Sequence, residues 1–348
     1  MKALFLVGGV GTRLQPLTDD LPKSMIPMMA KPLLERNILK LKDYGVNEII
    51  LSTCYKPQKI EKYFGDGTKL GIKIKYIEQD IPLGTGGAIK NAERFFNDTF
   101  IIFTQDILSD INIEDMMKFH KEKLAAVTIA VTEVKNPSDY GVIEYNDNLY
   151  AESFTGKPKL SEIKSNYINT GIYIFEPNVL KEIPESQVVS LEKETYPLLL
   201  KKNYPIAIYE SDAYWRDIGS IEEYIQAHDD ILSGDYSLSE IKDEHQNIFV
   251  GENTTIHSST KIIGPTYIGE NTKIGPNSTI GPNTIIGNNC KVGTNDIIID
   301  SIVWDKVSVE NNSTVSSVIL NSNFMISNNN ENVNNIETEA LNKKIALF

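Results

Sequence analysis

The sequence predicts an α/β domain with a mixed, mostly parallel sheet, followed by a parallel β-helix. Over roughly the first 230 residues, short apolar runs alternate with segments of helical periodicity. From about Asn247 onward, aliphatic residues instead recur at every sixth position. The length of 348 residues suits two domains better than one.

The first part of the chain alternates strands with helices. The expected strands are 4–7, 48–53, 73–77 and 99–104, and the expected helices are 32–44, 58–64 and 88–96. The first helix is favoured because Leu34, Ile38 and Leu41 fall at i, i+4 and i+7, and Gly45 follows as a stop signal. This alternation implies crossover units and a buried sheet whose active site lies at the carboxyl ends of its strands.

The second part carries a six-residue repeat. Its aliphatic positions are Val250, Ile256, Ile262, Ile268, Ile274, Ile280, Ile286, Val292 and Ile298, resuming after a one-residue slip at Val303, Val309 and Val315. Glycine often follows them, as at Gly251, Gly269, Gly275, Gly281, Gly287 and Gly293. The pattern resembles the hexapeptide repeat of left-handed β-helices, so residues 250–320 would form about four coils.

These patterns divide the chain into four regions. We expect a catalytic domain over 1–235, a linker over 236–247, the left-handed β-helix over 248–326, and an Asn-rich loop and C-terminal tail over 327–348. Residues 336–348 are compatible with a short helix that caps the open end of the solenoid.

Composition excludes several classes of function. The chain has 34 Lys and Arg against 47 Asp and Glu, a formal net charge of −13, which disfavours nucleic acid or anionic membrane as a partner. No apolar run approaches a membrane span, and the first residues become glycine-rich too early for a secretory leader. Cys54 and Cys290 give no disulfide or zinc pattern, so we expect a cytoplasmic protein.

A glycine-rich turn follows the first strand. In residues 8–14, GGVGTRL, backbone N–H groups can approach an anion closely, and phosphate is the usual one. The turn is not a Walker A loop, because no Gly-Lys-Ser/Thr follows. It is not a GxGxxG motif either, because Leu14 stands where the third glycine would be. Arg13 and Lys23 would bring two cations to one polyphosphate.

The chain resembles the sugar-phosphate nucleotidyltransferases, also called NDP-sugar pyrophosphorylases, over essentially all of residues 1–232. The motifs are GGVGTRLQPLT (8–18), PKSMIP (22–27), KPLLE (31–35), PLGTGGA (82–88), YGVIE (140–144), INTGIYIF (168–175), EKE (192–194) and YWRDIG (214–219). The appended repeat matches members with a C-terminal β-helix, among them mannose-1-phosphate guanylyltransferases. The resemblance implies a Rossmann-like nucleotidyltransferase domain.

In this family a sugar 1-phosphate attacks the α-phosphorus of a nucleoside triphosphate, and pyrophosphate leaves. The resemblance implies Arg13 and Lys23 as catalytic residues and Asp106 and Asp217 as the ligands of Mg²⁺. The implied nucleotide-binding residues are Leu6, Gly8, Gly9, Gly11, Thr12, Glu78, Gly84, Thr85 and Gln105. The implied sugar-phosphate-binding residues are Gly141, Lys157, Asn169, Gly171, Glu192 and Lys193.

Three residues depart from the family pattern. Gln105 replaces a small residue before the metal aspartate, Gly156 replaces the glutamate of a Glu-Lys-Pro motif, and Arg216 adds a cation beside Asp217. Asp106 also has a structural interpretation, because an aspartate after a strand is often a turn or cap residue. Trp215 is equally compatible with core packing and with a pocket wall.

The favoured function is Mg²⁺-dependent synthesis of an NDP-sugar, with GTP and mannose 1-phosphate as substrates. We also expect the chain to form a homo-oligomer through the β-helix. One alternative is the same reaction with dTTP or UTP and glucose 1-phosphate. Another is a catalytically weak regulatory or nucleotide-sugar-binding subunit, to which Gln105 and Gly156 point. A third is an acyltransferase in which His257, the only histidine of the β-helix, is the base.

Overall fold

The computed structural model describes residues 1–155, 165–238, 241, 247–327 and 345–346. The chain forms two compact units. The first unit comprises 1–26 and 33–217, and the second comprises 27–32 and 218–348. Helix α6 (Ile221–Ser233) therefore groups with the repeat region, whereas the sequence placed the boundary at 235. None of the helices in the described ranges is long and apolar enough to cross a membrane.

A nine-stranded sheet forms the centre of the first unit, and seven of its strands lie in the order β10-β9-β11-β6-β1-β4-β5. Of the other two strands, β8 pairs with β11, and β12 pairs with β8. Its strands are β1 (Lys2–Val7), β4 (Glu48–Thr53), β5 (Lys73–Glu78), β6 (Phe100–Thr104), β8 (Val127–Glu133), β9 (Val142–Tyr145), β10 (Ala151–Thr155), β11 (Tyr167–Phe175) and β12 (Ile206–Glu210). Strands β6, β1, β4 and β5 are parallel, and β11 runs antiparallel to β6. The mixed α/β sheet expected from the sequence is confirmed.

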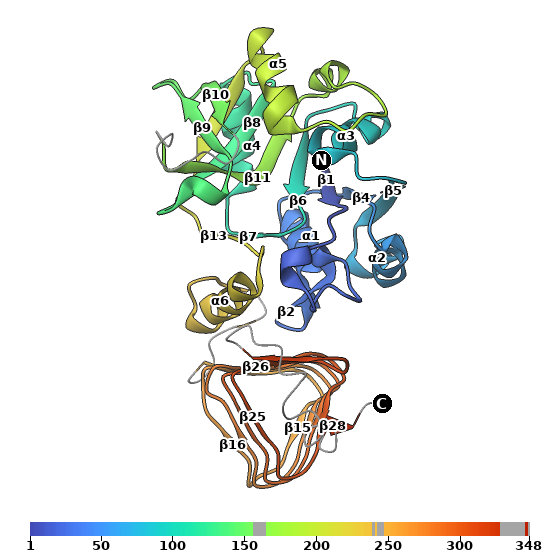
Figure 1. Cartoon of the computed structure of the whole chain (residues 1–348), viewed down its shortest axis with the longest axis vertical. Helices are drawn as coiled ribbons and strands as arrows, with labels where there is room; N and C mark the ends of the chain where they lie inside the picture. Colours follow the sequence, from blue (N-terminus) through green and yellow to red (C-terminus); the bar gives the residue numbers. More distant parts are fainter. Residues whose placement is uncertain (156–164, 239–240, 242–246, 328–344, 347–348) are drawn as a thin grey trace. The chain divides into compact units, whose positions relative to one another are not determined.

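The register of the parallel strands brings their carboxyl ends to one edge. Leu6 of β1 pairs with Ser52 of β4 on one side and with Thr104 of β6 on the other. The loops that follow Val7 and Thr104 therefore start next to each other. Figure 1 shows the arrows of β1 and β6 pointing toward this edge.

Helices cover both faces of the sheet, because successive residues of each strand point to opposite sides. The helices of this unit are α1 (Leu33–Asp43), α2 (Pro57–Phe64), α3 (Gly84–Asn91), α4 (Ile113–Glu122) and α5 (Tyr196–Lys201). Leu4 packs in a core with α3 and α5, whereas its neighbour Phe5 packs in a core with α1, α2 and α4. Burial on both faces explains why β1, β4 and β6 read as largely apolar runs.

Shorter elements complete this unit. They are the 3₁₀ turns η1 (Thr12–Leu14), η2 (Lys23–Met25), η3 (Thr68–Leu70), η4 (Glu93–Phe95), η5 (Pro137–Asp139) and η7 (Pro177–Glu182), the π-helical turn η8 (Leu191–Thr195), and the strands β7 (Ile107–Ser109) and β13 (Trp215–Asp217). Strands β7 and β13 pair antiparallel.

The helix expected at 88–96 differs from the structure. Helix α3 begins at Gly84, ends at Asn91 and is followed by the separate turn η4. The glycine-rich residues Gly84 to Gly87 form its first turn, so the helix begins four residues before the expected start at 88. Glycine is a poor helix former, so propensity alone points to a later start.

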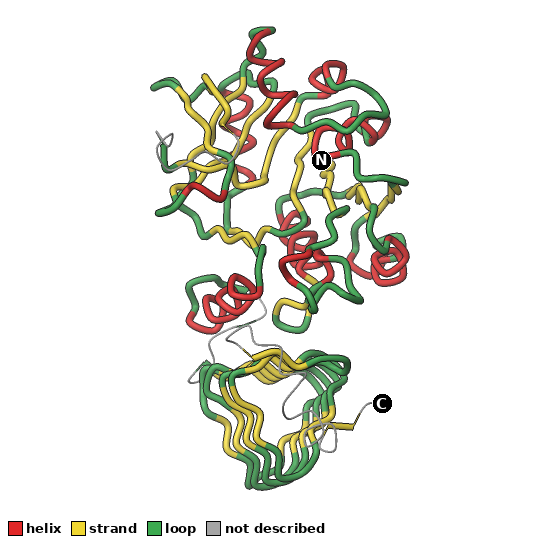
Figure 2. Tube along the Cα trace, in the orientation of Figure 1, coloured by secondary structure: helices red, strands yellow, loops and turns green. Residues whose placement is uncertain are grey.

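The repeat region folds as the expected left-handed β-helix. One sheet contains β14 (Ile248–Val250), β17 (Thr266–Ile268), β20 (Thr284–Ile286), β23 (Ile302–Val303), β26 (Val318–Leu320) and β27 (Met325–Ser327). The second contains β15 (Thr255–Ile256), β18 (Lys273–Ile274), β21 (Lys291–Val292), β24 (Ser308–Val309) and β28 (Ile345–Ala346), and the third β16 (Lys261–Ile262), β19 (Thr279–Ile280), β22 (Ile297–Ile299) and β25 (Thr314–Ser316). Figure 1 shows the resulting three-sided coil, and Figure 2 the short strands joined by turns.

The one-residue slip in the repeat is a shortened coil. Ile268 pairs with Ile286, and Ile286 pairs with Val303, so the later coil has one residue fewer. The inward aliphatic residues remain in register through the slip and form one core. The stack thus keeps its hydrophobic interior, which neighbouring coils bury for each other.

One face of the β-helix is covered within the second unit. Tyr267 and Ile285 alternate with the inward residues of their strands, so they face outward, yet they are 6% and 2% exposed. Tyr224 of α6 donates a hydrogen bond to Pro27 O over 2.7 Å and accepts one from Trp304 Nε1 over 3.0 Å. The hairpin of β2 (Pro27–Met28) and β3 (Lys31–Pro32) also joins the coils, since Asn288 Nδ2 donates to Ala30 O.

The end of the chain differs from the expected capping helix. Ile345 and Ala346 form strand β28, which pairs antiparallel with β24, so the helix expected over 336–348 is wrong at these two residues. The remaining residues of that segment lie outside the described ranges. A strand added to an open sheet edge satisfies backbone groups that a helix would leave unpaired there.

Candidate active site

A cavity of about 560 Å³ lies at the carboxyl edge of the parallel strands in the first unit. The predicted site residues that line it are Leu6, Gly8, Gly9, Arg13, Gly84, Thr85, Gln105, Asp106, Gly141, Asn169, Gly171, Glu192 and Asp217. They come from segments far apart in the sequence, which the sheet brings to one place. The cavity is therefore the candidate active site of this unit.

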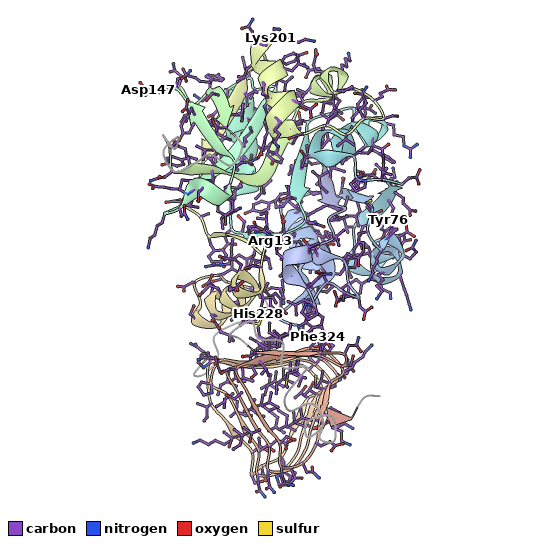
Figure 3. The ribbon with its side chains drawn as sticks, viewed as in Figure 1. Arg13, Tyr76, Asp147, Lys201, His228 and Phe324 are labelled. Carbon is purple, nitrogen blue, oxygen red and sulfur yellow. The ribbon has the colours of Figure 1, made fainter. Side chains whose placement is uncertain are left out.

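The glycine-rich turn forms one wall of the cavity. A Cβ atom on Gly9 would lie 2.0 Å from Gln105 Nε2, so only glycine allows the Gln105 side chain to lie against this backbone. Gly11 has a φ of 73° and directly precedes the turn η1, which carries Arg13. Arg13 is exposed and lines the cavity, whereas Gly11 and Thr12 do not line it. Figure 3 labels Arg13 near this edge of the unit.

Lys23 contacts both candidate metal ligands. Its Nζ lies 2.5 Å from Asp106 Oδ2 and 3.7 Å from Asp217 Oδ1. Lys23 is 6% exposed, and the side chains of Asp106 and Asp217 are 24% and 20% exposed. A contact this short between an ammonium and a carboxylate, largely shielded from water, is a strong charge-assisted hydrogen bond.

The pairing of two strands brings the aspartates together. Asp106 lies in the turn between β6 and β7, and Asp217 is the last residue of β13. In the antiparallel pair of β13 and β7, Asp217 lies opposite Ile107. Two acids far apart in the sequence thereby become neighbours across one strand pair, and Asp106 caps no helix.

The donor set fits a magnesium ion. Carboxylate oxygens are the ligands that this hard cation prefers, and both acids already converge on one cation, the Lys23 ammonium. Within the described ranges, no group of three or more His, Cys, Asp or Glu side chains could hold a metal. Two carboxylates with the remaining positions left to water and phosphate oxygens are a usual environment for Mg²⁺.

A second set of polar residues lines the cavity around β11. Asn169 Nδ2 donates hydrogen bonds of 2.9 Å to both Glu192 Oε1 and Tyr173 Oη, and Asn169 Oδ1 accepts one from Gly171 N. Gly141 lies against Glu192, since a Cβ there would be 2.6 Å from Glu192 Oε1. Burial, together with the nearby Glu192 charge, raises the pKa of Tyr173, so its hydroxyl stays protonated. These groups could bind the hydroxyls of a sugar.

Sequence reasoning missed Gln79. This residue directly follows β5, is 7% exposed and lines the cavity. Its Nε2 donates to Ser52 Oγ over 2.6 Å, and its Oε1 accepts from Leu83 N over 3.2 Å. Glu78, which the sequence favoured, is exposed and does not line the cavity. The position of Gln79 just after a predicted strand could have identified it, because the active site of such a sheet lies at the carboxyl ends of the strands.

The motif at 84–87 packs against the chain around Val189. Gly86 N donates to Val189 O over 2.8 Å, and Thr85 Oγ1 accepts from Leu191 N over 3.0 Å. Gly84 and Thr85 also line the cavity. The close approach of Val189 therefore gives these small residues a packing role in addition to the expected contact with a nucleoside.

Other predicted residues lie elsewhere. Lys157 and Gly156 fall outside the described residues. Lys193 is exposed and does not line the cavity; its backbone N donates to Ser190 Oγ. Arg216 Nε donates to Tyr214 Oη over 3.1 Å.

Trp215 and His257 also have defined surroundings. Trp215 lines the cavity, donates from Nε1 to Thr170 O over 2.9 Å and packs against Tyr140, so it is both a pocket wall and a packed residue. His257 is exposed in a turn of the β-helix, where its Nδ1 lies 2.8 Å from Ser259 Oγ.

Gln105 has an unusual environment. It lines the cavity, yet its Oε1 is buried without a hydrogen-bond partner in the part of the chain that the structure describes. A buried acceptor without a partner costs about 1–3 kcal/mol. A ligand donor that drew this amide outward would remove that cost.

Comparison with known proteins identifies the family of each part of the chain. Residues 2–234 match the family model described as nucleotidyl transferase, and residues 245–339 match the left-handed β-helix domain of the EIF2B subunit epsilon. A mannose-1-phosphate guanylyltransferase of Mycobacterium tuberculosis is 34% identical, covering 76% of this chain and 74% of its own. A UTP–glucose-1-phosphate uridylyltransferase of Synechocystis is also 34% identical, covering 76% of this chain and 77% of its own.

A solved structure is similar as well. HddC from Yersinia pseudotuberculosis, complexed with GMP-PN, superimposes with a TM-score of 0.57 at 29% identity, covering 66% of this chain and 98% of that one. The match in sequence and the fold of the first unit agree. The chain belongs to the nucleotidyl transferase family.

Proposed function

We propose that this chain transfers a nucleotidyl group from a nucleoside triphosphate, with GTP favoured, to a sugar 1-phosphate, with mannose 1-phosphate favoured, in a reaction that requires Mg²⁺. The observation that carries the proposal is the contact of Lys23 with both Asp106 and Asp217 at the cavity that Gly8 and Gly9 line. A fixed cation, two oxygen-donor acids and an open glycine backbone are what a polyphosphate and its metal ion require.

The reaction forms one bond and breaks one. A phosphate oxygen of the sugar 1-phosphate bonds to the α-phosphorus, and the bond from that phosphorus to the oxygen bridging to the β-phosphate breaks, so pyrophosphate leaves with the electron pair. Arg13 and Lys23 offset the charge on the triphosphate and on the leaving pyrophosphate. Asp106 and Asp217 would hold Mg²⁺, which when bound neutralises phosphate charge. Asn169 and Glu192 orient the sugar.

The relatives support the choice of base and sugar. The Mycobacterium tuberculosis protein and a Hypocrea jecorina protein, 35% identical over 75% of this chain, are both named for mannose 1-phosphate and guanylyl transfer. The Yersinia structure holds GMP-PN. The Synechocystis relative favours a second candidate function, the same transfer with UTP and glucose 1-phosphate.

A substrate matrix tests both candidates. The purified full chain is incubated with Mg²⁺, each of GTP, UTP, dTTP, ATP and CTP, and mannose or glucose 1-phosphate, and pyrophosphate release is measured. We expect the highest kcat/KM with GTP and mannose 1-phosphate. Preference for UTP and glucose 1-phosphate would select the second candidate, and no release with any pair would refute both.

Two variants test whether the activity depends on residues of the cavity. Asp217→Asn removes one of the two acids at Lys23, and we expect a loss of kcat of about a hundredfold or more, the scale of a lost charge-stabilising group. The matched control is Asp147→Asn, an exposed aspartate of the same unit that lines no part of the cavity. Equal activity of the two variants would contradict the assigned site.

A further inference from the structure

The Lys23 ammonium lies where a metal ion would have to bind. Its nitrogen is 2.5 Å from Asp106 Oδ2 and within ion-pair distance of Asp217 Oδ1, at 3.7 Å. Mg²⁺ binds oxygen ligands at about 2.0–2.1 Å, so an ion shared by Asp106 Oδ2 and Asp217 Oδ1 would take the place of the ammonium between them. The ammonium and the ion therefore compete for these two acids.

The surroundings of Lys23 hold it in this position. Lys23 is 6% exposed and belongs to the short turn η2, where Met25 N donates a hydrogen bond to Pro22 O over 2.8 Å. Gly11 packs against its aliphatic stem, since a Cβ there would lie 3.0 Å from Lys23 Cβ. This packing holds the stem of Lys23 beside the two acids.

Given the proposed function, we propose that Lys23 excludes free divalent ions from Asp106 and Asp217 until a triphosphate draws its ammonium away. The triphosphate offers Lys23 a more highly charged partner and leaves both acids free for the metal that accompanies it. Nucleotide and metal then bind with positive coupling, which must be reciprocal. Lys23 is thus a positioning residue for the metal site as well as a phosphate ligand.

Direct competition can be separated from a general effect of charge. Arg13 lines the same cavity with the same formal charge, but no contact between it and either aspartate is found among the described residues. Removing Arg13 changes the electrostatic potential of the cavity without uncovering the carboxylates. Removing Lys23 does both, so the two substitutions should affect metal binding differently.

The experiment measures Mn²⁺ binding to the full chain without nucleotide, by electron paramagnetic resonance and by calorimetry. We expect weak binding to the wild type, affinity that rises about tenfold or more in Lys23→Met, and little change in Arg13→Met. Adding Asp106→Asn to Lys23→Met should abolish the gain. Lys23→Gln, which keeps a polar side chain, serves as a second variant if Lys23→Met does not fold.

Three results would overturn the proposal. These are tight Mn²⁺ binding by the nucleotide-free wild type at a site that Asp106→Asn removes, an unchanged affinity in Lys23→Met or Lys23→Gln, and an equal gain in Arg13→Met. The wild-type measurement needs no variant of Lys23, so tight binding there would overturn the proposal even if both variants fail to fold. Failure of the proposed function would appear separately, as absent pyrophosphate release in the substrate matrix.

Discussion

The side-chain amide of Asn169 donates a hydrogen bond of 2.9 Å to Glu192 Oε1, which joins β11 to the π-helical turn at the wall of the cavity. This turn follows Ser190, whose Oγ accepts a hydrogen bond from Lys193 N. The pair fixes a carboxylate beside Gly141, at the part of the cavity assigned to the sugar.

Glu192→Gln tests that assignment. The neutral amide is a weaker acceptor for sugar hydroxyls, so KM for the sugar 1-phosphate should rise about tenfold while KM for the nucleotide changes little. Initial rates with each substrate varied in turn measure both constants. The control is Glu194→Gln, an exposed neighbour that accepts from Ser190 N. An increase confined to the nucleotide KM would place Glu192 at the other substrate.

Gly9→Ala should damage nucleotide binding through Gln105. The new methyl group would lie 2.0 Å from Gln105 Nε2 and would push that side chain into the cavity. We expect kcat/KM for the nucleotide to fall about tenfold, the scale of a lost hydrogen bond or a displaced contact. The double variant Gly9→Ala with Gln105→Ala should recover most of this loss, measured as a double-mutant cycle against Gln105→Ala alone. Additive losses would show that the two residues act independently.

Tyr224→Phe should destabilise the second unit. The hydroxyl that it removes is fully buried and connects Pro27 O with Trp304 Nε1, so both groups lose their partner. The expected loss in the free energy of unfolding is about 2 kcal/mol. Urea unfolding followed by tryptophan fluorescence measures it. Tyr76→Phe, which removes an exposed hydrogen bond to Gly65 O, should cost much less.

The buried His120 predicts a pH dependence of stability. Its Nδ1 lies 2.7 Å from Thr128 Oγ1 and its Nε2 3.2 Å from Glu176 Oε1. Burial lowers the pKa of His120 below the ordinary value of 6.5, although Glu176 opposes this shift. The unfolded chain then binds a proton at a higher pH than the folded one, so the folded state loses stability as the pH falls from 6.5 toward the folded pKa.

His120→Gln isolates that contribution. The free energy of unfolding of the wild type, minus that of the variant, should be constant above neutral pH and fall below about pH 6.5, by up to about 1.4 kcal/mol per unit. Denaturant unfolding at several pH values measures the difference. His257→Gln, at an exposed turn, is the control. A difference that does not vary with pH would mean that the pKa of His120 is the same in the folded and unfolded states.

The repeats and buried strands were predictable because each follows a simple periodicity. Inward positions such as Ile268 and Ile274 recur with the coil, and strand β4 matches its predicted bounds. The start of α3 was not predictable in this way, because the contact of Gly86 with Val189 O is tertiary. Likewise, the pairing of Asp217 with Ile107 depends on strand contacts that no local pattern reveals.

The sequence also contains a pattern of outward-facing residues that the six-residue periodicity does not describe. Outward positions on two faces of the β-helix carry residues such as Lys273 and Thr279, whereas the third face carries Tyr267 and Ile285. An apolar outward residue in every third hexapeptide indicates a covered face. The structure shows α6 and the hairpin at 27–32 in the same unit as that face. The partners of the face could not be named without the fold.

The hairpin at 27–32 belongs to the second unit, although it follows Lys23 closely and precedes α1 in the chain. Its backbone is hydrogen-bonded by Tyr224, His228 and Asn288, all of which come after Asp217. A protein shortened at Asp217 would therefore lose the β-helix and also the residues that hydrogen-bond to this hairpin. The hairpin beyond Lys23 would lose the two donors Tyr224 and Asn288 and the acceptor His228. The backbone would also end directly at one of the two acids, so the nucleotidyl transferase fold of this chain cannot be separated from the residues that follow it.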